Sequence, residues 1–353
     1  MKRRTVFAKV LVILGALAFA LSGSSCERRE TLRIYTWTLY LPTSIVRQFE
    51  SEFGVRVIMD YYTSNEEMLA RLMAGGVNFD LAFPSGDFVP ILDRLGKLYP
   101  IDHAMIPNLA NIDPVILEKS ADPLIESSVP YFYGAAGIIV NTARVPDFER
   151  SWSIFERADI RDAAGNPRMS MLDDMREVMG AALSYLGYSV NTRNPAEIAA
   201  ARDHIVRHWR PNIVRFDSEA FGIGYSNEDF WVVHGFPELI FAEIAGNERL
   251  IRDTSFFIPE GSPAYIDSIV ILDGSRSVEL AHEFINFVHR PEVYAEFVDM
   301  LNFPASVNVP ARRYTTVVPM FTVEELYYTE LVQDAGPAFA YFDDAWLNTI
   351  RIE

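Results

Sequence analysis

A short apolar run near the start of this 353-residue chain ends in two aromatic side chains and a pair of threonines. Leu32 and Ile34 predict a buried strand that leads to Trp37, Thr38 and Tyr40. Flat aromatic faces attract alkylammonium groups and pack against methylene chains. The segment therefore indicates one wall of a ligand cleft. A pair of core aromatics at a strand end is the structural alternative.

Three acidic residues stand where a positively charged partner would be needed. Asp174 and Glu177 are three residues apart at the predicted start of a helix, so both lie on one face, where the helix dipole favours ionised carboxylates. Asp267 interrupts the apolar run 265–272, and a buried charge is costly without a partner. Asp174 could also act only as a helix cap, so the spacing alone leaves both roles open.

An alternation of strands and helices positions these groups. The first part of the chain predicts strands at 32–37, 55–60 and 79–83, and helices at 44–53, 65–74 and 88–95. This order implies a parallel sheet with right-handed crossovers, and we expect the second and third strands to be neighbours. Thr43 or Ser44 is the expected cap of the first helix and Asn65 that of the second. Residues 99–130 predict surface loops with short helical turns.

A second α/β unit begins with a predicted strand within 134–141. Its expected elements are strands near 168–172 and 213–216, helices near 174–186 and 195–209, a strand at 265–272, and helices at 277–289 and 292–300. Neither an internal repeat nor a low-complexity linker separates the two units. Two domains joined in this way are expected to be connected by crossing strands that act as a hinge.

The amino terminus has the features of a secretory signal. Lys2, Arg3, Arg4 and Lys9 precede an apolar run of 12 residues at 10–21, which is too short to span a bilayer. Small residues then precede Cys26, the only cysteine in the chain. This segment resembles a bacterial lipoprotein signal, in which the cysteine becomes the acylated first residue. The common leucine three places earlier is replaced by Gly23, and ordinary cleavage that leaves a free Cys26 is the alternative.

The composition restricts the class of partner. Without residues 1–26 the chain has 27 basic and 48 acidic residues, a net charge of −21, which repels nucleic acid and attracts small cations. The single cysteine rules out an intramolecular disulfide, so packing alone must stabilise the fold. About 327 residues remain after cleavage, enough for two domains with sizeable cores.

Several motifs, taken in order, resemble the solute-binding proteins of bacterial ABC polyamine importers, which bind spermidine and putrescine. The resemblance covers roughly residues 31–313. It rests on segments 35–40 (YTWTLY), 64–66 (SNE), 79–85 (FDLAFPS), 138–141 (IIVN), 173–178 (DDMREV), 264–268 (AYIDS), 284–291 (FINFVHRP) and 302–304 (NFP). Each segment alone is weak, and their order and spacing together are specific.

The resemblance implies a two-lobed type II periplasmic-binding-protein fold of the α/β class. Two mixed sheets flanked by helices would be joined by a hinge of crossing strands, with the ligand between the lobes. Residues 31–137 and 267–302 would form the first lobe, and residues 138–266 and 303–353 the second. Residues 1–26 would be the signal peptide.

The resemblance also assigns ligand contacts residue by residue. It implies a set of stacking aromatics, polar contacts and amine-binding carboxylates: Trp37, Thr38, Tyr40, Ser85, Asp174, Glu177, Tyr265, Asp267 and Phe303. Trp231 and His234 are further candidates, because the motif around them is offset from that of the family. Leu39 departs from the family, which often has an acid at that place. We expect Asp87 to replace it. Tyr265 and Phe303 could equally be core residues.

Two other classes of function remain to be weighed. Glycosidases use paired carboxylates, but nothing in the sequence predicts acids on opposite sides of a sugar, and we expect no enzymatic activity. His204 and His208 have the spacing of two metal ligands on a helix, but no third ligand accompanies them. We expect no cofactor. A protein of the same fold for an amino acid or a sugar is the main alternative.

The sequence thus predicts a monomeric polyamine receptor in the periplasm. A lipid on Cys26 would anchor it to a bacterial membrane, and an ABC permease with its ATPase would be its partner. The choice between putrescine and spermidine does not follow from these residues.

Overall fold

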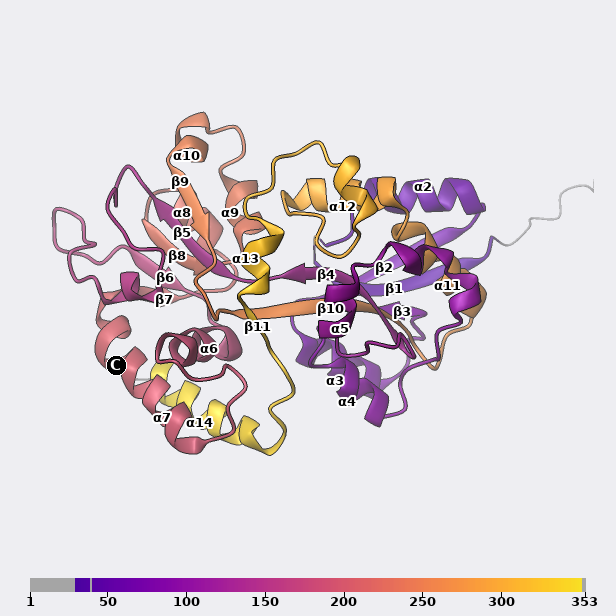
Figure 1. The fold of residues 1–353 in the computed structure, drawn as a ribbon, viewed down its shortest axis with the longest axis horizontal. Helices are drawn as coiled ribbons and strands as arrows, with labels where there is room; N and C mark the ends of the chain where they lie inside the picture. The colour runs from indigo at the N-terminus through magenta and orange to yellow at the C-terminus, as the bar shows by residue number, and fades with distance from the viewer. Residues whose placement is uncertain (1–28, 39, 351–353) are drawn as a thin grey trace, which may run out of the picture.

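Two β-sheets organise the part of the chain that the computed structural model describes, residues 29–38 and 40–350 (Figure 1). The first sheet has the order β11-β10-β3-β1-β2, and β4 also pairs with β10. Its strands are β1 (Thr31–Trp37), β2 (Arg56–Tyr62), β3 (Leu81–Ala82), β4 (Ser128–Gly134), β10 (Pro263–Ile271) and β11 (Glu330–Leu331).

The second sheet has the order β7-β6-β8-β5-β9. Its strands are β5 (Gly137–Asn141), β6 (Met169–Met171), β7 (Ile213–Phe216), β8 (Val232–Gly235) and β9 (Thr254–Phe257). Strand β6 is parallel to β7 and β8, whereas β5 is antiparallel to β8 and β9. In the first sheet β1 is parallel to β2 and β3, and β10 is antiparallel to β3 and β4. Both sheets are therefore mixed, as predicted.

Helices cover both faces of each sheet (Figure 1). Those of the first body are α2 (Thr43–Phe53), α3 (Asn65–Ala74), α4 (Val89–Arg94), α5 (Pro114–Lys119), α11 (Val278–Val288) and α12 (Pro291–Leu301). Those around the second sheet are α6 (Met175–Tyr185), α7 (Pro195–His204), α8 (Phe221–Ser226), α9 (Pro237–Glu243), α10 (Glu248–Arg252) and α14 (Phe339–Ile350), and α13 (Val323–Tyr327) lies near the crossing strands.

Apolar residues at helical spacing explain how α2 covers its sheet. Ile45, Val46 and Phe49 are buried on one face, and the helix ends at Gly54, whose φ of 69° is readily adopted by glycine. Strands β4 and β5 are buried along their whole length, as expected for strands covered on both faces. The cores of both bodies therefore come from periodic apolar residues rather than from cross-links.

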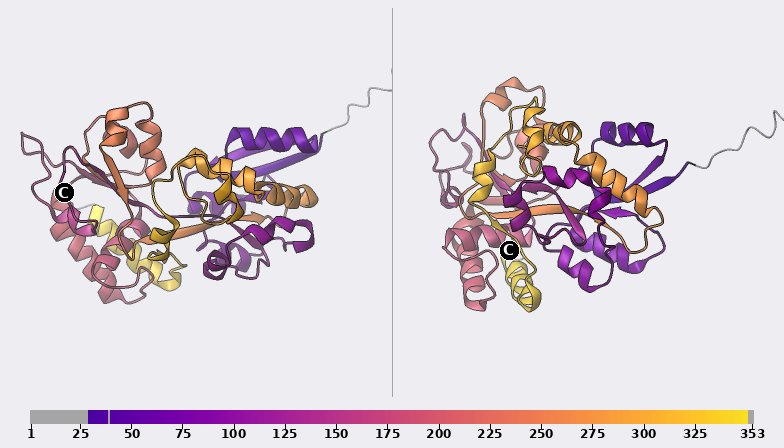
Figure 2. Two further views of the ribbon diagram at one scale, coloured as in Figure 1. Left: turned by 45° about the horizontal axis from the view of Figure 1, so that its top comes forward. Right: turned by 45° about the vertical axis from the view of Figure 1, so that its right-hand side comes forward.

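Strands β4 and β10 form an antiparallel ribbon that runs between the two bodies (Figure 1). The ribbon has the same position in both views of Figure 2. The register of this ribbon shifts between Asp267 and Ser268. Such a bulge bends a strand and redirects a side chain. The irregularity thus falls on the acidic residue that the sequence singles out.

The structure differs from the sequence prediction in several places. Strand β1 lies between β2 and β3, so the second and third strands are not neighbours. Ser64, not Asn65, caps α3 by accepting a hydrogen bond from the backbone of Glu67, and α2 has no side-chain cap because Pro42 precedes it. The loops expected up to residue 130 contain the start of β4, and β8 and β9 were not predicted.

The division of the chain into lobes stays a prediction, but contacts refine it near residue 303. A 3-10 helix at Pro310–Arg313 contacts α12, and Arg312 forms an ion pair with Asp113 of the first body. Ile112 and Asn308 pair as an isolated bridge. This stretch therefore packs with the first body rather than with the second sheet.

Candidate functional site

The candidate residues gather where parallel strands end. Trp37 is the last residue of β1, and Ser85 and Asp87 follow β3. In the second sheet, Asp174 follows β6 and Glu238 follows β8. In open α/β sheets, ligands bind outside the carboxyl ends of the strands. The two sheets therefore direct these residues toward the region between the two bodies, beside the β4–β10 ribbon.

Asp267 is the most enclosed carboxylate of this group, with 3% of its surface exposed. The Ser85 hydroxyl donates to its Oδ1 at 2.7 Å, and the Tyr40 hydroxyl donates to its Oδ2 at 3.1 Å. Burial raises the pKa of Asp267 to about 7, although these two hydrogen bonds act in the opposite direction. The structure thus joins Tyr40, Ser85 and Asp267, which are far apart in the sequence.

An aromatic layer surrounds this triad. The Tyr40 ring lies edge-on to Phe83, Phe132 and Phe297, with centroid distances of 5.5 to 5.9 Å. Tyr265, half-buried, lies 6.1 Å from both Phe132 and Phe236. This low-dielectric surrounding is what makes an unpaired charge at Asp267 costly.

Asp174 and Glu177 begin helix α6 on the opposite side. Asp174 caps the helix, because its Oδ1 accepts from the backbone amides of Arg176 and Glu177 at 2.9 and 3.0 Å. Its side chain is exposed, and the same two hydrogen bonds oppose the rise in its pKa that desolvation causes. Glu177 is buried, with an enclosed Oε2 that has no partner. Burial, together with the nearby Asp174, raises its pKa well above the usual range.

Glu238 is a fifth carboxylate of the region, which the sequence reading missed. It lies in the first turn of α9, and its Oε2 is enclosed without a partner. Burial raises its pKa to about 7, and Asp267 adds to the effect. The available signal was an acid three residues after a short segment that ends in glycine, 232–235, whose strand character was not predicted. Phe236, two residues earlier, was missed for the same reason.

We call Asp87, Asp174, Glu177, Glu238 and Asp267 the carboxylate cluster. Electrostatic interactions link its members in a chain across the two bodies. Arg176 is the nearest guanidinium to Asp87 and Asp174, but its hydrogen bonds go to Gln333, Val190 and Asn191. Among the described residues, His234 is the one basic side chain within 4.0 Å of the cluster, at 3.9 Å from Glu177.

Asp87 is half-buried in the turn after Ser85. Burial raises its pKa to about 6, while the positive charge of Arg176 opposes the shift. The backbone amide of Ser85 donates to the Asn65 side chain at 3.2 Å, which fixes this turn. Asn65 therefore supports the site instead of capping its helix.

Trp37, Thr38 and Phe303 differ in how deeply their side chains are buried. The indole of Trp37 is half-buried, donates to the carbonyl of Phe83 at 2.8 Å, and lies 4.6 Å from the Tyr62 ring. Thr38 is exposed. Phe303 is buried between Phe132 and Phe321, at 5.1 and 5.0 Å, in the manner of a core residue.

Two candidates lie away from the position that the sequence assigned to them. Trp231 precedes β8, so it lies at the opposite end of that strand from Glu238, where Arg144 and Arg168 stack on its ring at 5.6 and 6.0 Å. His234 is fully buried inside the second body. The structure therefore keeps Trp231 apart from the cluster and places His234 behind it.

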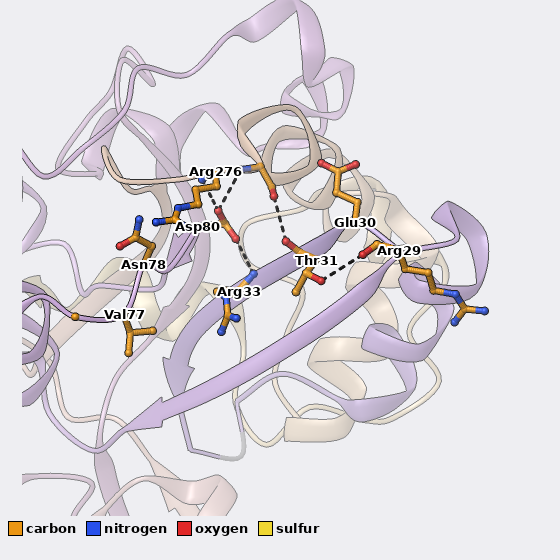
Figure 3. Close-up of a pocket in the computed structure, with 10 residues that line it drawn as sticks. Arg29, Glu30, Thr31, Arg33, Val77, Asn78, Asp80 and Arg276 are labelled. Atoms are coloured by element: carbon orange, nitrogen blue, oxygen red, sulfur yellow. Dashed lines mark hydrogen bonds between the residues drawn. The ribbon is translucent and has the colours of Figure 1, made fainter. Parts of the chain in front are cut away.

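Two concave surfaces lie away from the carboxylate cluster. One is at the amino end of β1, where Arg29, Arg33, Asn78 and Arg276 surround the buried Asp80 (Figure 3). No group of three metal-binding side chains occurs in the described ranges. The rings of His204 and His208 are tilted to one another with centroids 4.7 Å apart, and His204 faces Glu156 at 3.0 Å. None of the helices in the described ranges is long and apolar enough to cross a bilayer. Cys26, the signal segment and Leu39 lie outside the described residues.

Comparisons with known proteins agree on one family. Residues 44–312 match the model described as "Bacterial extracellular solute-binding protein". The spermidine/putrescine-binding periplasmic protein of Salmonella typhimurium is 32% identical over 315 residues, which cover 87% of this chain and 86% of that protein. The putrescine-binding periplasmic protein PotF of Escherichia coli is 28% identical and covers 92% of both chains.

A solved structure gives a similar result. The crystal structure of the TpPotD lipoprotein of Treponema pallidum is 44% identical, with a TM-score of 0.87, over 92% of this chain and all of that one. The two-lobed architecture predicted from the motifs is confirmed by this likeness and by the two mixed sheets. The chain belongs to the family of bacterial extracellular solute-binding proteins, among relatives named for the polyamines that they bind.

Proposed function

We propose that this protein is the polyamine receptor of an ABC importer and binds putrescine, spermidine or both between its two lobes. One observation carries the proposal: five carboxylates converge beside an aromatic layer, and among the described residues no lysine or arginine forms a direct ion pair with them. A ligand that supplies ammonium groups on an apolar chain would complete this arrangement. The names of the relatives support the same ligand class.

The physical argument concerns charge. Removing an ionised carboxylate from water costs several kcal/mol, which only a close cation with further hydrogen bonds can offset. Burial raises the pKa values of Asp267 and Glu238 to about 7, so at neutral pH each avoids part of this cost by binding a proton for about half of the time. A bound ammonium group would favour the ionised form of each. The ligand thus provides the missing half of every ion pair.

The aromatic residues would recognise the apolar part of the ligand. Methylene groups pack on flat rings, and each ammonium over a ring contributes about 0.5–2 kcal/mol. Tyr40 donates a hydrogen bond to Asp267, and Tyr265 is close enough to Glu238 and Asp267 for their charges to add to the rise in its pKa that burial causes. Phe236 lies beside Tyr265, and Trp37 ends β1 on the first-body side. A sugar would also stack on these rings, but it would leave the carboxylates without cations. The distribution of charge therefore favours a polyamine over a sugar.

Closure of the two lobes around the ligand would follow from the way in which the carboxylate cluster is divided between them. Asp87 and Ser85 extend from the first sheet, Asp174, Glu177 and Glu238 from the second, and Asp267 from the ribbon between them. A ligand that contacts both groups stabilises the closed arrangement over any open one, because only closure brings both groups to it. The β4–β10 ribbon is the proposed hinge.

The surroundings in the cell follow from the sequence and the relatives. We propose that Cys26 carries a lipid that anchors the protein to a bacterial membrane in the periplasm. A permease with its own ATPase would receive the ligand. The lipoprotein from Treponema pallidum supports the anchor by analogy. We therefore propose that the protein captures the ligand for transport and catalyses no reaction.

Asp87 is the proposed substitute for the acid missing at Leu39. It would receive an ammonium group at the first-body end, where its nearest fixed cation is Arg176. If so, Asp87→Asn should weaken polyamine binding about 10-fold, since a hydrogen bond to a charged group contributes about 1.5–3 kcal/mol. Unchanged affinity in this variant would reject the substitution and leave Asp87 as a partner of Arg176.

Calorimetric titration of residues 27–353, unfolded and refolded to remove any bound ligand, tests the proposal. Putrescine, cadaverine, spermidine, spermine, a panel of amino acids and maltose would be compared. We expect saturable one-to-one binding of at least one polyamine at micromolar or lower concentration. No heat with any polyamine, but saturation with another solute, would keep the fold and reject the ligand.

A further inference from the structure

Three histidines are almost completely enclosed in the described part of the chain, and they differ in how their rings are paired. His289 has each ring nitrogen within hydrogen-bond distance of a carbonyl oxygen, that of Ile285 at 2.8 Å and that of Pro130 at 2.9 Å, so its N–H has an acceptor in either tautomer. His282 is paired as well, through Val278 at 2.8 Å and the Asp102 amide at 3.0 Å. His234 has 0% exposure, and neither of its nitrogens has a partner. A buried polar ring without partners is uncommon and calls for an explanation.

The surroundings of His234 direct attention to Glu177. The Nε2 of the ring lies 3.9 Å from Oε2 of that carboxylate, which is itself enclosed without a partner. The other oxygen, Oε1, is not among the enclosed unpaired atoms and accepts no hydrogen bond from the described residues. Trp152 holds the imidazole edge-on, with 4.9 Å between ring centroids. Two unpaired groups thus face one another behind the carboxylate cluster.

The separation suits a contact that forms when the side chain of Glu177 moves. A hydrogen bond needs about 2.7–3.2 Å between nitrogen and oxygen, so a movement of about 1 Å closes the gap. Burial lowers the pKa of His234 to about 3, so the ring is neutral at physiological pH and one of its nitrogens carries a proton. It can therefore donate a hydrogen bond without adding a charge to the cluster.

We propose that His234 is a positioning residue for ligand binding: its Nε2–H donates to Oε2 of Glu177 and keeps Oε1 directed at an ammonium group of the ligand. This inference rests on the proposed function, and it revises the sequence prediction that His234 contacts the ligand itself. Full burial excludes such a contact, whereas the position behind Glu177 gives the residue a role through the carboxylate. Neither oxygen of an ionised Glu177 would then lack a partner.

The proposal explains why an unpaired ring is retained at this place. A phenyl ring would pack on Trp152 as well and would bury no unpaired nitrogen, so stability alone favours an apolar residue. The hydrogen bond from the ring is strongest when Glu177 is ionised, because a carboxylate is a better acceptor than a neutral carboxyl group. A bound ammonium group favours ionisation, because burial and the nearby Asp174 raise the pKa of Glu177 and the positive charge acts in the opposite direction.

Two substitutions at this position separate positioning from packing. His234→Phe keeps an aromatic ring against Trp152 but removes the donor, and His234→Gln keeps an N–H donor in a side chain of similar length. Polyamine affinity should fall about 10- to 100-fold in His234→Phe and stay within about threefold in His234→Gln. The melting temperature of ligand-free His234→Phe should equal or exceed that of the native chain.

A double-mutant cycle with Glu177→Gln tests whether the effect passes through the carboxylate. Once Glu177 is neutral, His234→Phe should cause no further loss of affinity. His289→Phe is the matched control, since it removes an equally buried ring whose hydrogen bonds are made. That variant should lower the melting temperature and leave the affinity unchanged.

The outcomes distinguish this inference from the proposed function. If the native chain binds no polyamine, both are overturned. If the native chain binds a polyamine and Glu177→Gln weakens it, while His234→Phe binds as tightly as the native chain, only the inference is overturned. Independent, additive losses from the two substitutions would also overturn it. A loss of affinity in a properly folded His234→Gln equal to that in His234→Phe would have the same consequence.

Discussion

Asp80 and Asp267 lie at opposite ends of β3 and are almost equally buried, at 2% and 3% exposure, but they are paired in different ways. Asp80, at the amino end, accepts from three backbone amides, of Arg33, Arg276 and Ser277 (Figure 3). It also accepts from the Ser275 hydroxyl. Asp267, at the carboxyl end, accepts from two hydroxyls only.

The difference shows how one sheet uses the same side chain for two purposes. Four donors within 3.3 Å complete the hydrogen bonding of Asp80 and tie β1, β3 and the start of α11 together. Asp267 has room for a further partner, and its pKa of about 7 shows that the protein alone does not stabilise its charge. A complete donor set marks a structural carboxylate, and an incomplete one marks a carboxylate that awaits a cation.

The largest effect is expected for Asp267→Asn. It should lower polyamine affinity at least about 100-fold, because an ammonium group would lose its most enclosed anion, a loss on the order of 3–5 kcal/mol. The ligand-free chain should be as stable as the native one, since the amide oxygen can still accept from Ser85 or Tyr40. Calorimetry and denaturant unfolding measure the two quantities. Thr38→Ala, which alters an exposed side chain, is the control. Equal losses of affinity in both variants would remove Asp267 from its assigned role.

The opposite result is expected for Asp80→Asn. An amide has one acceptor oxygen, so it cannot serve the four donors around Asp80, and the free energy of unfolding should fall by about 1–3 kcal/mol. Polyamine affinity should not change, because Asp80 precedes β3 and the carboxylate cluster lies beyond the other end of that strand. The comparison between the ends of β3 fails if this variant binds more weakly while its stability is native.

Local sequence patterns predicted most of this architecture. Helices α2, α3, α6, α11 and α12 have the apolar spacing that the 3.6-residue period requires, and their observed ends lie within two residues of those expected. Strand order was harder, because periodicity carries no information on which strands are neighbours. The central position of β1 between β2 and β3 depends on contacts between distant segments.

The site was predictable as residue types but not as a network. Asp267 was recognisable because an acid in an apolar strand needs a partner. Its bonds to Tyr40 and Ser85 join three separate regions of sequence, which no local pattern reveals. Glu238 and Phe236 were missed because β8 is a four-residue strand followed by a proline-started helix. Trp231 was proposed from an offset motif, and the register of β8 moves it to the far end.

The pH dependence of binding sharpens the comparison further. The sequence alone predicts that affinity falls below about pH 4–5, where ordinary carboxylates protonate. Burial raises the pKa values of Asp267 and Glu238 to about 7, so the structure moves the expected loss of affinity to the range below about pH 7. Each protonated carboxylate must release its proton to the solvent when an ammonium group binds. At pH 6 we expect a release of about two protons per ligand from Asp267 and Glu238, to which Glu177 and Asp87 add because burial raises their pKa values as well. At pH 8.5 Asp267 and Glu238 should release almost none.

Titrations in two buffers with different ionisation enthalpies measure this release. The ligand-free stability should follow the same groups with a defined sign. Their folded-state pKa values exceed those of the unfolded chain, so the folded state binds more protons between about pH 4 and 7. Stability from these groups is therefore present at low pH and lost as the pH rises through 7. Equal heats in both buffers at pH 6 would show that the carboxylates are already ionised.

The smallest effect compares two tryptophans at opposite strand ends. Trp37 closes the carboxyl end of β1, and Trp231 precedes the amino end of β8. Trp37→Leu should weaken polyamine binding by about 0.5–2 kcal/mol, which is the contribution of one cation–aromatic contact. Trp231→Leu should leave affinity unchanged, since Arg144 and Arg168 already cover its ring. Titration of both variants tests whether aromatic residues, like the carboxylates, contribute to binding only at the carboxyl ends of the strands. A loss of affinity in Trp231→Leu alone would reverse that assignment.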